Sequence, residues 1–134
     1  SNVVRKNIIK MLSSAGSGHP GGSLSSTDIL VSLYFSGYLN ISKKNYKSQA
    51  RDVVILSAGH YCPALYAILA EKKFYKKRLL DSLRKFGSPL LGHPKFLELP
   101  GVENSGGSLG QGISLACGYA ISAKRFVKRK NCLN

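Results

Sequence analysis

Apolar residues recur at helical spacing along much of the chain, and this pattern predicts a series of amphipathic helices. The spacing predicts a first helix over residues 3–14. A second helix is predicted to open at Ser25-x-x-Asp28, which resembles a capping box, and to stop near Gly37. Pro63 occupies a favoured first helical position and predicts the start of a third. Their expected buried faces are Val4, Ile8, Met11 and Leu12, then Ile29, Leu30, Leu33 and Tyr34, then Ala64, Leu65, Ile68 and Leu69.

Two further helices follow in the second half of the chain. The first is closed by Gly87, and the second runs from about Gly112 to Val127. The last helix is rich in glycine and alanine, which favours close packing on a sheet or another helix. Between them, residues 87–112 form a long loop punctuated by Gly and Pro, and loops of this length in compact domains are usually functional or disordered. The apolar positions of the earlier helix are Leu79, Leu80, Leu83 and Phe86.

One short segment has the pattern of a strand. Residues 53–56 are Val-Val-Ile-Leu, an apolar run that suits a strand covered on both faces, as in a parallel sheet. His60 lies shortly after Leu56, where ligands bind in α/β proteins beyond the carboxyl ends of strands. The sequence therefore predicts an α/β fold, helix-rich with a partial parallel sheet, in a single domain of 134 residues.

The charge balance is strongly basic. Twenty Lys and Arg against six Asp and Glu give a net charge of +14, which suits a nucleic acid, an anionic small molecule or merely solvated helix faces. No aromatic RNA-binding signature, zinc-finger spacing or arginine-rich arm accompanies the lysines, so nucleic acid is disfavoured. No apolar run approaches the length of a membrane span and no signal peptide opens the chain, so we expect a cytoplasmic protein.

The cysteines do not form a recognisable framework. Cys62, Cys117 and Cys132 are odd in number and far apart, which fits neither disulfides nor a Cys-x-x-Cys metal site. We expect reduced thiols, with Cys117 buried in a helix. Cys62 follows His60 closely, but nothing else in the sequence supports a nucleophilic pair.

The three histidines share a local context. His19, His60 and His93 each follow a glycine, and all lie in predicted loops. A single loop histidine is more often a surface or capping residue than a catalyst. Three together suit proton transfer among hydroxyls, or donation to a phosphate or sugar. Zinc is the rival ligand, although the histidines lack the close spacing of catalytic zinc sites.

A second glycine-rich motif, "GGSLGQG" at 106–112, leads into the last predicted helix. It matches neither the dinucleotide-binding fingerprint nor the phosphate-binding P-loop. Unpaired backbone N–H groups and the helix dipole favour an anion at such a helix start. A turn needed only for tight packing is the alternative.

The motifs taken together resemble the amino-terminal, thiamine-diphosphate-binding part of transketolase. The resemblance covers roughly residues 3 to 125, and it is strongest to the separate N-terminal subunit of split bacterial and archaeal transketolases. It depends on four motifs in the family's order: "SGHPGGSLSSTDIL", "LSAGHYCPALYAILAEKKF", "GSPLLGHP" and "PGVENSGGSLGQGISLACGYAISAK".

The resemblance implies a transferase that moves a two-carbon ketol unit between sugar phosphates with thiamine diphosphate. It implies that His19 contacts hydroxyls of the donor sugar, that His60 lies near the cofactor diphosphate and the substrate, and that His93 acts near the acceptor carbonyl. It further implies that Gly107, Ser108 and Leu109 contact the cofactor. The implied partners are a C-terminal subunit with the pyrimidine-binding domain and a second copy.

The chain also departs from the family pattern. A Gly-Asp-Gly motif and a later Asn hold the family's Mg²⁺ or Ca²⁺, and no Gly-Asp-Gly occurs in these 134 residues, so we expect no metal ligands here. Gly106 stands where Ser or Thr is usual, and Tyr61 and Cys62 occupy commonly small positions.

These departures predict a domain truncated before its metal motif and inactive alone. Truncation within the domain, decay of the gene, or completion by another polypeptide would each account for them, and we favour the first two. We also expect poor stability, because a severed sheet leaves apolar faces uncovered. The alternative function is a basic, non-catalytic module that binds RNA or an acidic partner.

Overall fold

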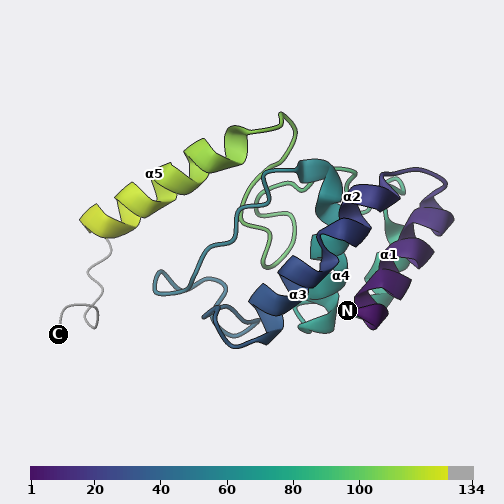
Figure 1. Ribbon diagram of the computed structural model, residues 1–134, viewed down its shortest axis with the longest axis horizontal. Helices are drawn as coiled ribbons and strands as arrows, with labels where there is room; N and C mark the ends of the chain where they lie inside the picture. The colour runs from purple at the N-terminus through teal and green to yellow at the C-terminus, as the bar shows by residue number, and fades with distance from the viewer. Residues whose placement is uncertain (127–134) are drawn as a thin grey trace.

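The computed structural model describes residues 1–126 and consists of helices joined by long loops (Figure 1). Five are α-helices and two are short 3₁₀ helices within the described part. Their order is α1 (Asn2–Ala15), α2 (Pro20–Ser25), α3 (Thr27–Phe35), η1 (Gly59–Tyr61), α4 (Cys62–Glu71), η2 (Lys77–Ser82) and α5 (Gln111–Phe126).

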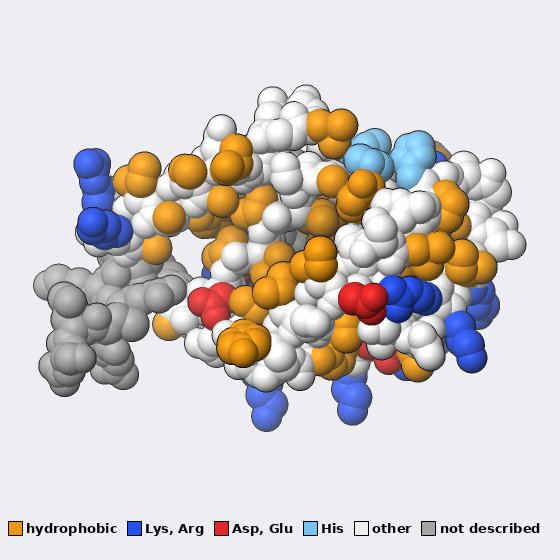
Figure 2. Space-filling view, in the orientation of Figure 1, with side chains coloured by type: hydrophobic (Ala, Val, Ile, Leu, Met, Phe, Trp, Pro, Cys, Tyr) orange, Lys and Arg blue, Asp and Glu red, His pale blue; other side chains and the backbone are white. Residues whose placement is uncertain are grey.

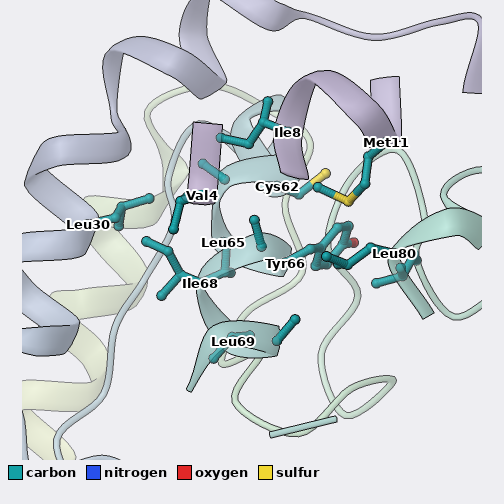
Figure 3. Packing of buried hydrophobic residues seen from close by; sticks show 14 of the residues in the cluster. Val4, Ile8, Met11, Leu30, Cys62, Leu65, Tyr66, Ile68, Leu69 and Leu80 are labelled. Carbon is teal, nitrogen blue, oxygen red and sulfur yellow. The ribbon is translucent and has the colours of Figure 1, made fainter. Parts of the chain in front are cut away.

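Helix α4 forms the centre of the core. Helices α1, α2 and α3 and the 3₁₀ helix η2 all contact it, and every residue from Cys62 to Ala70 is buried. Figure 3 shows Leu65 and Ile68 of α4 beside Val4 of α1 and Leu30 of α3. A helix that is apolar on all sides must be covered on all sides, and α4 meets that requirement.

The predictions for α1 and the start of α4 are confirmed. Helix α1 buries its four expected residues and ends at Gly16, whose φ of 62° is a left-handed conformation that glycine adopts without strain. Helix α4 begins at Cys62, one residue before Pro63. The polar connection after Gly37 consists of turns, bends and irregular segments.

The predicted capping box at Ser25 and Asp28 is wrong. Ser25 ends the additional helix α2, and its hydroxyl donates to the carbonyl of Gly22 instead of capping α3. Asp28 accepts two hydrogen bonds from the Arg5 guanidinium, at 3.0 and 2.7 Å. The residues that follow His19 were expected to continue its loop, but they form α2 instead. Pro20 occupies the first position of this helix, where proline favours a helix start.

The Arg5–Asp28 pair makes stability depend on acidity. The Arg5 side chain, chiefly through its hydrogen bonds, lowers the pKa of Asp28 to about 2. Because this pKa is below the value of about 3.9 for an unfolded chain, the pair stabilises the fold above about pH 4 and ceases to do so as the pH falls toward 2. We therefore expect Asp28→Asn to lower the thermal midpoint at pH 7 and to differ much less from the parent chain at pH 2. A difference that persisted unchanged at pH 2 would contradict this explanation.

The helix predicted up to Gly87 is shorter than expected. The 3₁₀ helix η2 ends at Ser82, and Phe86 is fully exposed. Leu83, with a ψ of 126°, leaves the helical conformation, and Arg84 follows with a φ of 60°. The backbone N–H of Arg84 donates to the carbonyl of Leu90 at 2.8 Å. The segment thus turns back on itself instead of continuing as a helix.

No strand is assigned within residues 1–126, so the partial sheet stays a prediction. The N–H of Leu56 donates to Oδ1 of Asn104 at 2.9 Å, and Nδ2 of Asn104 donates to the Leu56 carbonyl at 3.2 Å. One side-chain amide therefore satisfies the two backbone groups that a neighbouring strand would otherwise bind.

Helix α5 extends away from the other helices (Figure 1). It begins at Gln111 as expected, whereas its predicted last residue, Val127, lies outside the described residues. The expected close packing is not found, because apolar residues such as Ile113 and Ile121 are 72% and 56% exposed. Cys117, expected to be buried, is exposed for the same reason. A groove of about 610 Å³ lies between α5 and residues 49–55.

No helix among residues 1–126 is long and apolar enough to cross a lipid bilayer.

Candidate functional site

The loops that carry the sequence-predicted site residues meet at one end of the helical core. The rings of His19 and His60 lie edge to face, with their centroids 5.3 Å apart. His19 immediately precedes α2, and His60 is in η1, just before α4. Figure 2 shows histidine side chains gathered at one edge of the molecule. The packing of α2 against η1 and α4 therefore brings together two histidines from distant parts of the sequence.

Tyr61 holds the first two histidine loops in contact. Its ring lies 4.4 Å from that of His60, centroid to centroid, in an edge-to-face arrangement. The same ring packs against Gly22 of α2, where a Cβ atom would come within 1.8 Å of Tyr61 Cε1. The large residue at position 61 is thus accommodated because Gly22 has no side chain.

The loop of His93 lies against the loop of His60. The thiol of Cys62 donates to the carbonyl of Gly92 at 3.2 Å, and Tyr66 donates to that of Leu91 at 3.1 Å. On the other side of His93, the Pro94 carbonyl accepts a hydrogen bond from the N–H of Gly106 at 2.9 Å. His93 itself is exposed, so its imidazole is open to solvent beside these contacts.

The glycine turn packs directly on the His60 loop. A Cβ atom on Gly59 would lie 2.9 Å from the Cα of Gly106, and one on Gly106 would lie 2.7 Å from the Cα of Gly59. Real Cβ atoms do not approach other atoms this closely, so neither position has room for a side chain. In this chain the close contact therefore depends on glycine at both positions.

Residues 107–109 leave backbone donors open to solvent. Within the described part of the chain, no hydrogen bond uses the N–H groups of Gly107, Ser108 or Leu109. All three residues are exposed, and α5 begins two residues later. The turn is fixed beside Ser57, whose hydroxyl accepts the N–H of Gly112 at 3.2 Å. Free N–H groups near a helix N-terminus are suited to an anionic group such as a diphosphate.

Cys62 is unsuited to act as a nucleophile. It is 1% exposed, and burial raises the pKa of its thiol to about 12. A thiol with this pKa is almost entirely protonated near neutral pH, whereas nucleophilic attack needs the thiolate. Its hydrogen bonds to the His93 loop give it a structural role.

Three contributors to the site were not found by sequence reasoning. Asn104 links the turn to Leu56, and its neighbour Glu103 is buried and paired with Arg51, with Nε to Oε1 at 3.0 Å. Arg84 approaches two of the histidine loops. An Asn or Arg in a loop has no distinctive spacing in a single sequence, so only the burial and the contacts reveal these residues.

The described residues contain no group of three or more His, Cys, Asp or Glu side chains that could hold a metal ion. His19 and His60 are neighbours, but they do not form part of such a ligand set. Residues 1–126 thus offer no complete set of metal ligands.

Comparison with known proteins identifies the family to which the chain belongs. Residues 1–132 match the family model described as "Transketolase, thiamine diphosphate binding domain". The chain therefore belongs to the thiamine-diphosphate-binding domain family of transketolases, and the resemblance predicted from its motifs is confirmed.

The matching relatives include subunits of split enzymes. The chain is 39% identical over 120 residues to an apulose-4-phosphate transketolase subunit of Phocaeicola vulgatus, covering 90% of this chain and 42% of that protein. It is 40% identical over 124 residues to the 6-deoxy-6-sulfo-D-fructose transketolase subunit SqwG of a Clostridium species, covering 92% and 45%. The chain thus spans less than half the length of these relatives.

A solved structure shows the same fold. The transketolase from Leishmania mexicana superposes with a TM-score of 0.80 and 31% identity, covering 90% of this chain and 18% of that one. The expected family fold is confirmed at the level of this domain. The alternative of a basic module for RNA or an acidic partner finds no support in these matches.

Proposed function

We propose that this chain supplies the histidine loops and the diphosphate-facing turn of a transketolase that transfers a two-carbon ketol unit between sugar phosphates. The observation that carries the proposal is the series of contacts that joins the three Gly-His loops and the glycine turn, in which the His19 loop reaches the turn through His60. His19 and His60 are in ring contact, and the neighbours of His93 bond to Cys62 and Gly106. Proton transfers among sugar oxygens need several imidazoles within reach of one substrate.

Each histidine has a distinct role in the proposal. His19, at the start of α2 beside small residues, accepts and returns protons at hydroxyls of the donor sugar. His93, exposed on its loop, does so at the carbonyl oxygen of the acceptor. His60 lies between the His19 ring and the glycine turn, from where it can donate to both the substrate and a diphosphate oxygen. Neutral imidazole donates a hydrogen bond at one nitrogen and accepts at the other, so it can both take up and return a proton.

The described residues fit thiamine diphosphate at the turn. Gly107, Ser108 and Leu109 offer unused N–H donors, and no atom occupies the space where a Cβ of Gly107 would be. The backbone at this position can therefore approach a flat ring or a phosphate closely. When bound, the cofactor supplies the carbanion that attacks the sugar carbonyl. The residues of this chain orient it and manage protons around it.

We further propose that the metal ligands and the remainder of the site come from outside residues 1–134. A hard Mg²⁺ or Ca²⁺ ion needs several oxygen ligands, and no such group is found among the described residues. The subunit names of these relatives favour a separate partner subunit. We propose that this partner carries the C-terminal, pyrimidine-binding part and that a second copy of the assembly completes the enzyme, as the family resemblance implies. The domain would then be incomplete, and residues 1–134 alone would be inactive. As a separate point, we propose that the protein is cytoplasmic.

The absence of further chain also affects the predicted partial sheet, because residues 53–56 have no neighbouring strand within the described residues. We propose that residues 53–56 become a parallel strand when further chain pairs with them. Val53 and Ile55 are half-buried and line the groove beside α5, together with Ala116 and Tyr119. An added strand would cover this apolar groove and the exposed side of α5.

Calorimetric titration and activity assays test the proposed function. We expect residues 1–134 alone to bind thiamine diphosphate with Mg²⁺ more weakly than micromolar, because the ion that neutralises the diphosphate has no ligands here. In the complete enzyme, with the C-terminal partner bound, we expect His19→Ala or His93→Ala to lower kcat by about 10² to 10⁴-fold, the usual contribution of a general acid or base.

Tyr38→Ala is the control, because Tyr38 is 84% exposed on the loop after α3 and away from the site residues. Micromolar binding by residues 1–134 would contradict the proposed incompleteness. Unchanged two-carbon transfer in all the histidine variants would contradict the proposed function.

A further inference from the structure

Arg84 is held in an unusual backbone conformation next to the His93 loop. Its φ of 60° lies in the left-handed region, which a residue other than glycine adopts only when its surroundings require it. The hydrogen bond from its N–H to the Leu90 carbonyl, at 2.8 Å, closes a short loop that ends just before His93. The backbone of Arg84 is therefore fixed relative to residues 90–93.

The side chain of Arg84 reaches the His19 loop. Its Nη1 donates to the hydroxyl of Ser17 at 3.0 Å, across 67 residues of sequence. Ser17 lies two residues before His19, and its hydroxyl in turn donates to the Ala15 carbonyl at 3.4 Å. The arginine thus connects the end of α1 with the segment that leads into α2.

The guanidinium also covers the backbone of Gly92, the residue before His93. A Cβ atom on Gly92 would lie 2.9 Å from Nε, 3.1 Å from Nη2 and 3.2 Å from Cζ of Arg84. Three atoms at similar distances show that the flat face of the group lies against this position. A lysine, with one round ammonium group, cannot reproduce this contact together with the bond to Ser17.

The charge of Arg84 also acts on Cys62, the first residue of α4, which follows the His60 loop. Burial raises the pKa of the Cys62 thiol, and the positive charge of Arg84 opposes that rise. Within the described residues, no carboxylate lies within ion-pair distance of the Arg84 guanidinium. Its contacts are therefore with the histidine loops and not with an acidic partner.

We propose that Arg84 is a positioning residue that sets the spacing between His19 and His93. One planar group bonds to the loop of the first and covers the backbone preceding the second. The proposal rests on the proposed function only for its consequence in catalysis, because the coupling between the loops exists without a cofactor. Displacing the guanidinium would allow both loops to move while the helical core, centred on α4, stays folded.

Nuclear magnetic resonance of the three imidazoles in the cofactor-free chain tests the coupling directly. We expect Arg84→Ala to shift the side-chain resonances of both His19 and His93, and Arg84→Lys to shift them similarly. Gly92→Ala keeps the arginine but places a methyl group where its guanidinium lies, so it is expected to shift the same two histidines.

Matched controls separate this effect from a change of charge or of glycine content. Arg78→Ala removes the same charge from an exposed position on η2, and Gly21→Ala adds a methyl group where no atom lies within 4 Å. Both should leave the imidazole resonances of His93 in place. Unchanged His19 resonances in Arg84→Ala and Gly92→Ala would overturn the proposal. Global unfolding of Arg84→Ala would also overturn it, because the residue would then support the whole fold.

The assembled enzyme provides a second readout. A displacement of about 1 Å in a catalytic group can cost about 100-fold in rate, so we expect Arg84→Ala to lower kcat by about that factor. The affinity for thiamine diphosphate should stay unchanged, since Arg84 does not contact the glycine turn. Failure of the parent enzyme to bind the cofactor would contradict the proposed function and leave the resonance result standing. An unchanged kcat in Arg84→Ala would contradict the positioning role.

Discussion

Gly59→Ala is expected to separate the His60 loop from the glycine turn and to remove most of the two-carbon transfer activity. The added methyl group would lie 2.9 Å from the Cα, 3.0 Å from the carbonyl carbon of Gly106 and 3.1 Å from the nitrogen of Gly107. These are all backbone atoms, so the overlap can be relieved only by moving one main chain away from the other. A shift of about 1 Å would lower the rate by about 100-fold.

The measurement combines kcat/KM of the assembled enzyme with urea unfolding of the chain. Overpacking of this kind typically costs about 1–3 kcal/mol in the free energy of unfolding, so the domain should be destabilised yet folded. Gly118→Ala is the matched control, because a Cβ there meets no atom within 4 Å and Gly118 lies inside α5. That variant should gain up to about 1 kcal/mol from helix propensity. Gly59→Ala with the activity of the parent enzyme would show that the close approach does not matter.

Ile68→Ala is expected to cause the largest loss of stability by a single truncation. Ile68 is 0% exposed on α4, and Figure 3 shows it beside Val4 of α1 and Leu30 of α3. Removing buried methyl groups leaves a cavity that the surrounding helices can only partly close, at a cost of about 2–5 kcal/mol. Small domains have about 5–15 kcal/mol in total, so the midpoint of urea unfolding should fall markedly.

Ile29→Ala provides the comparison for this core variant. Ile29 has the same side chain on α3 but is 66% exposed. Its replacement should change the free energy of unfolding by no more than about 0.5 kcal/mol. Equal unfolding midpoints for the two variants would mean that α4 is not the centre of the core.

Local pattern predicted the buried face of α1 correctly and that of α3 only in part, since Leu30 and Tyr34 are buried whereas Ile29 and Leu33 are exposed. The spacing that predicted a helix over residues 3–14 identified the four residues that α1 buries. The same reasoning assigned one buried face to α4, whereas the structure buries all of Cys62–Ala70. Periodicity cannot distinguish these cases, because the number of neighbours around a helix is a property of the fold.

The errors have the same origin. The expected capping box at Ser25 and Asp28 does not form, because the Asp28 carboxylate accepts hydrogen bonds from Arg5 on another helix. The sequence predicted that the last helix packs closely on a neighbour. In the structure Ile113 and Cys117 of α5 are exposed, because nothing in the described chain covers them. In each case a contact distant in sequence, or its absence within residues 1–126, overrode a local preference.

The sequence by itself determined the chemical groups of the site. Three imidazoles after glycines, and a glycine-rich turn before a helix, are properties of residue type and order, and they predict proton transfer and a bound anion. Only the tertiary structure decided their distances. The contact of His19 with His60 and the approach of Gly59 to Gly106 arise because α2, η1 and α4 pack together. Such packing depends on burial summed over the whole core, which no local stretch of sequence specifies.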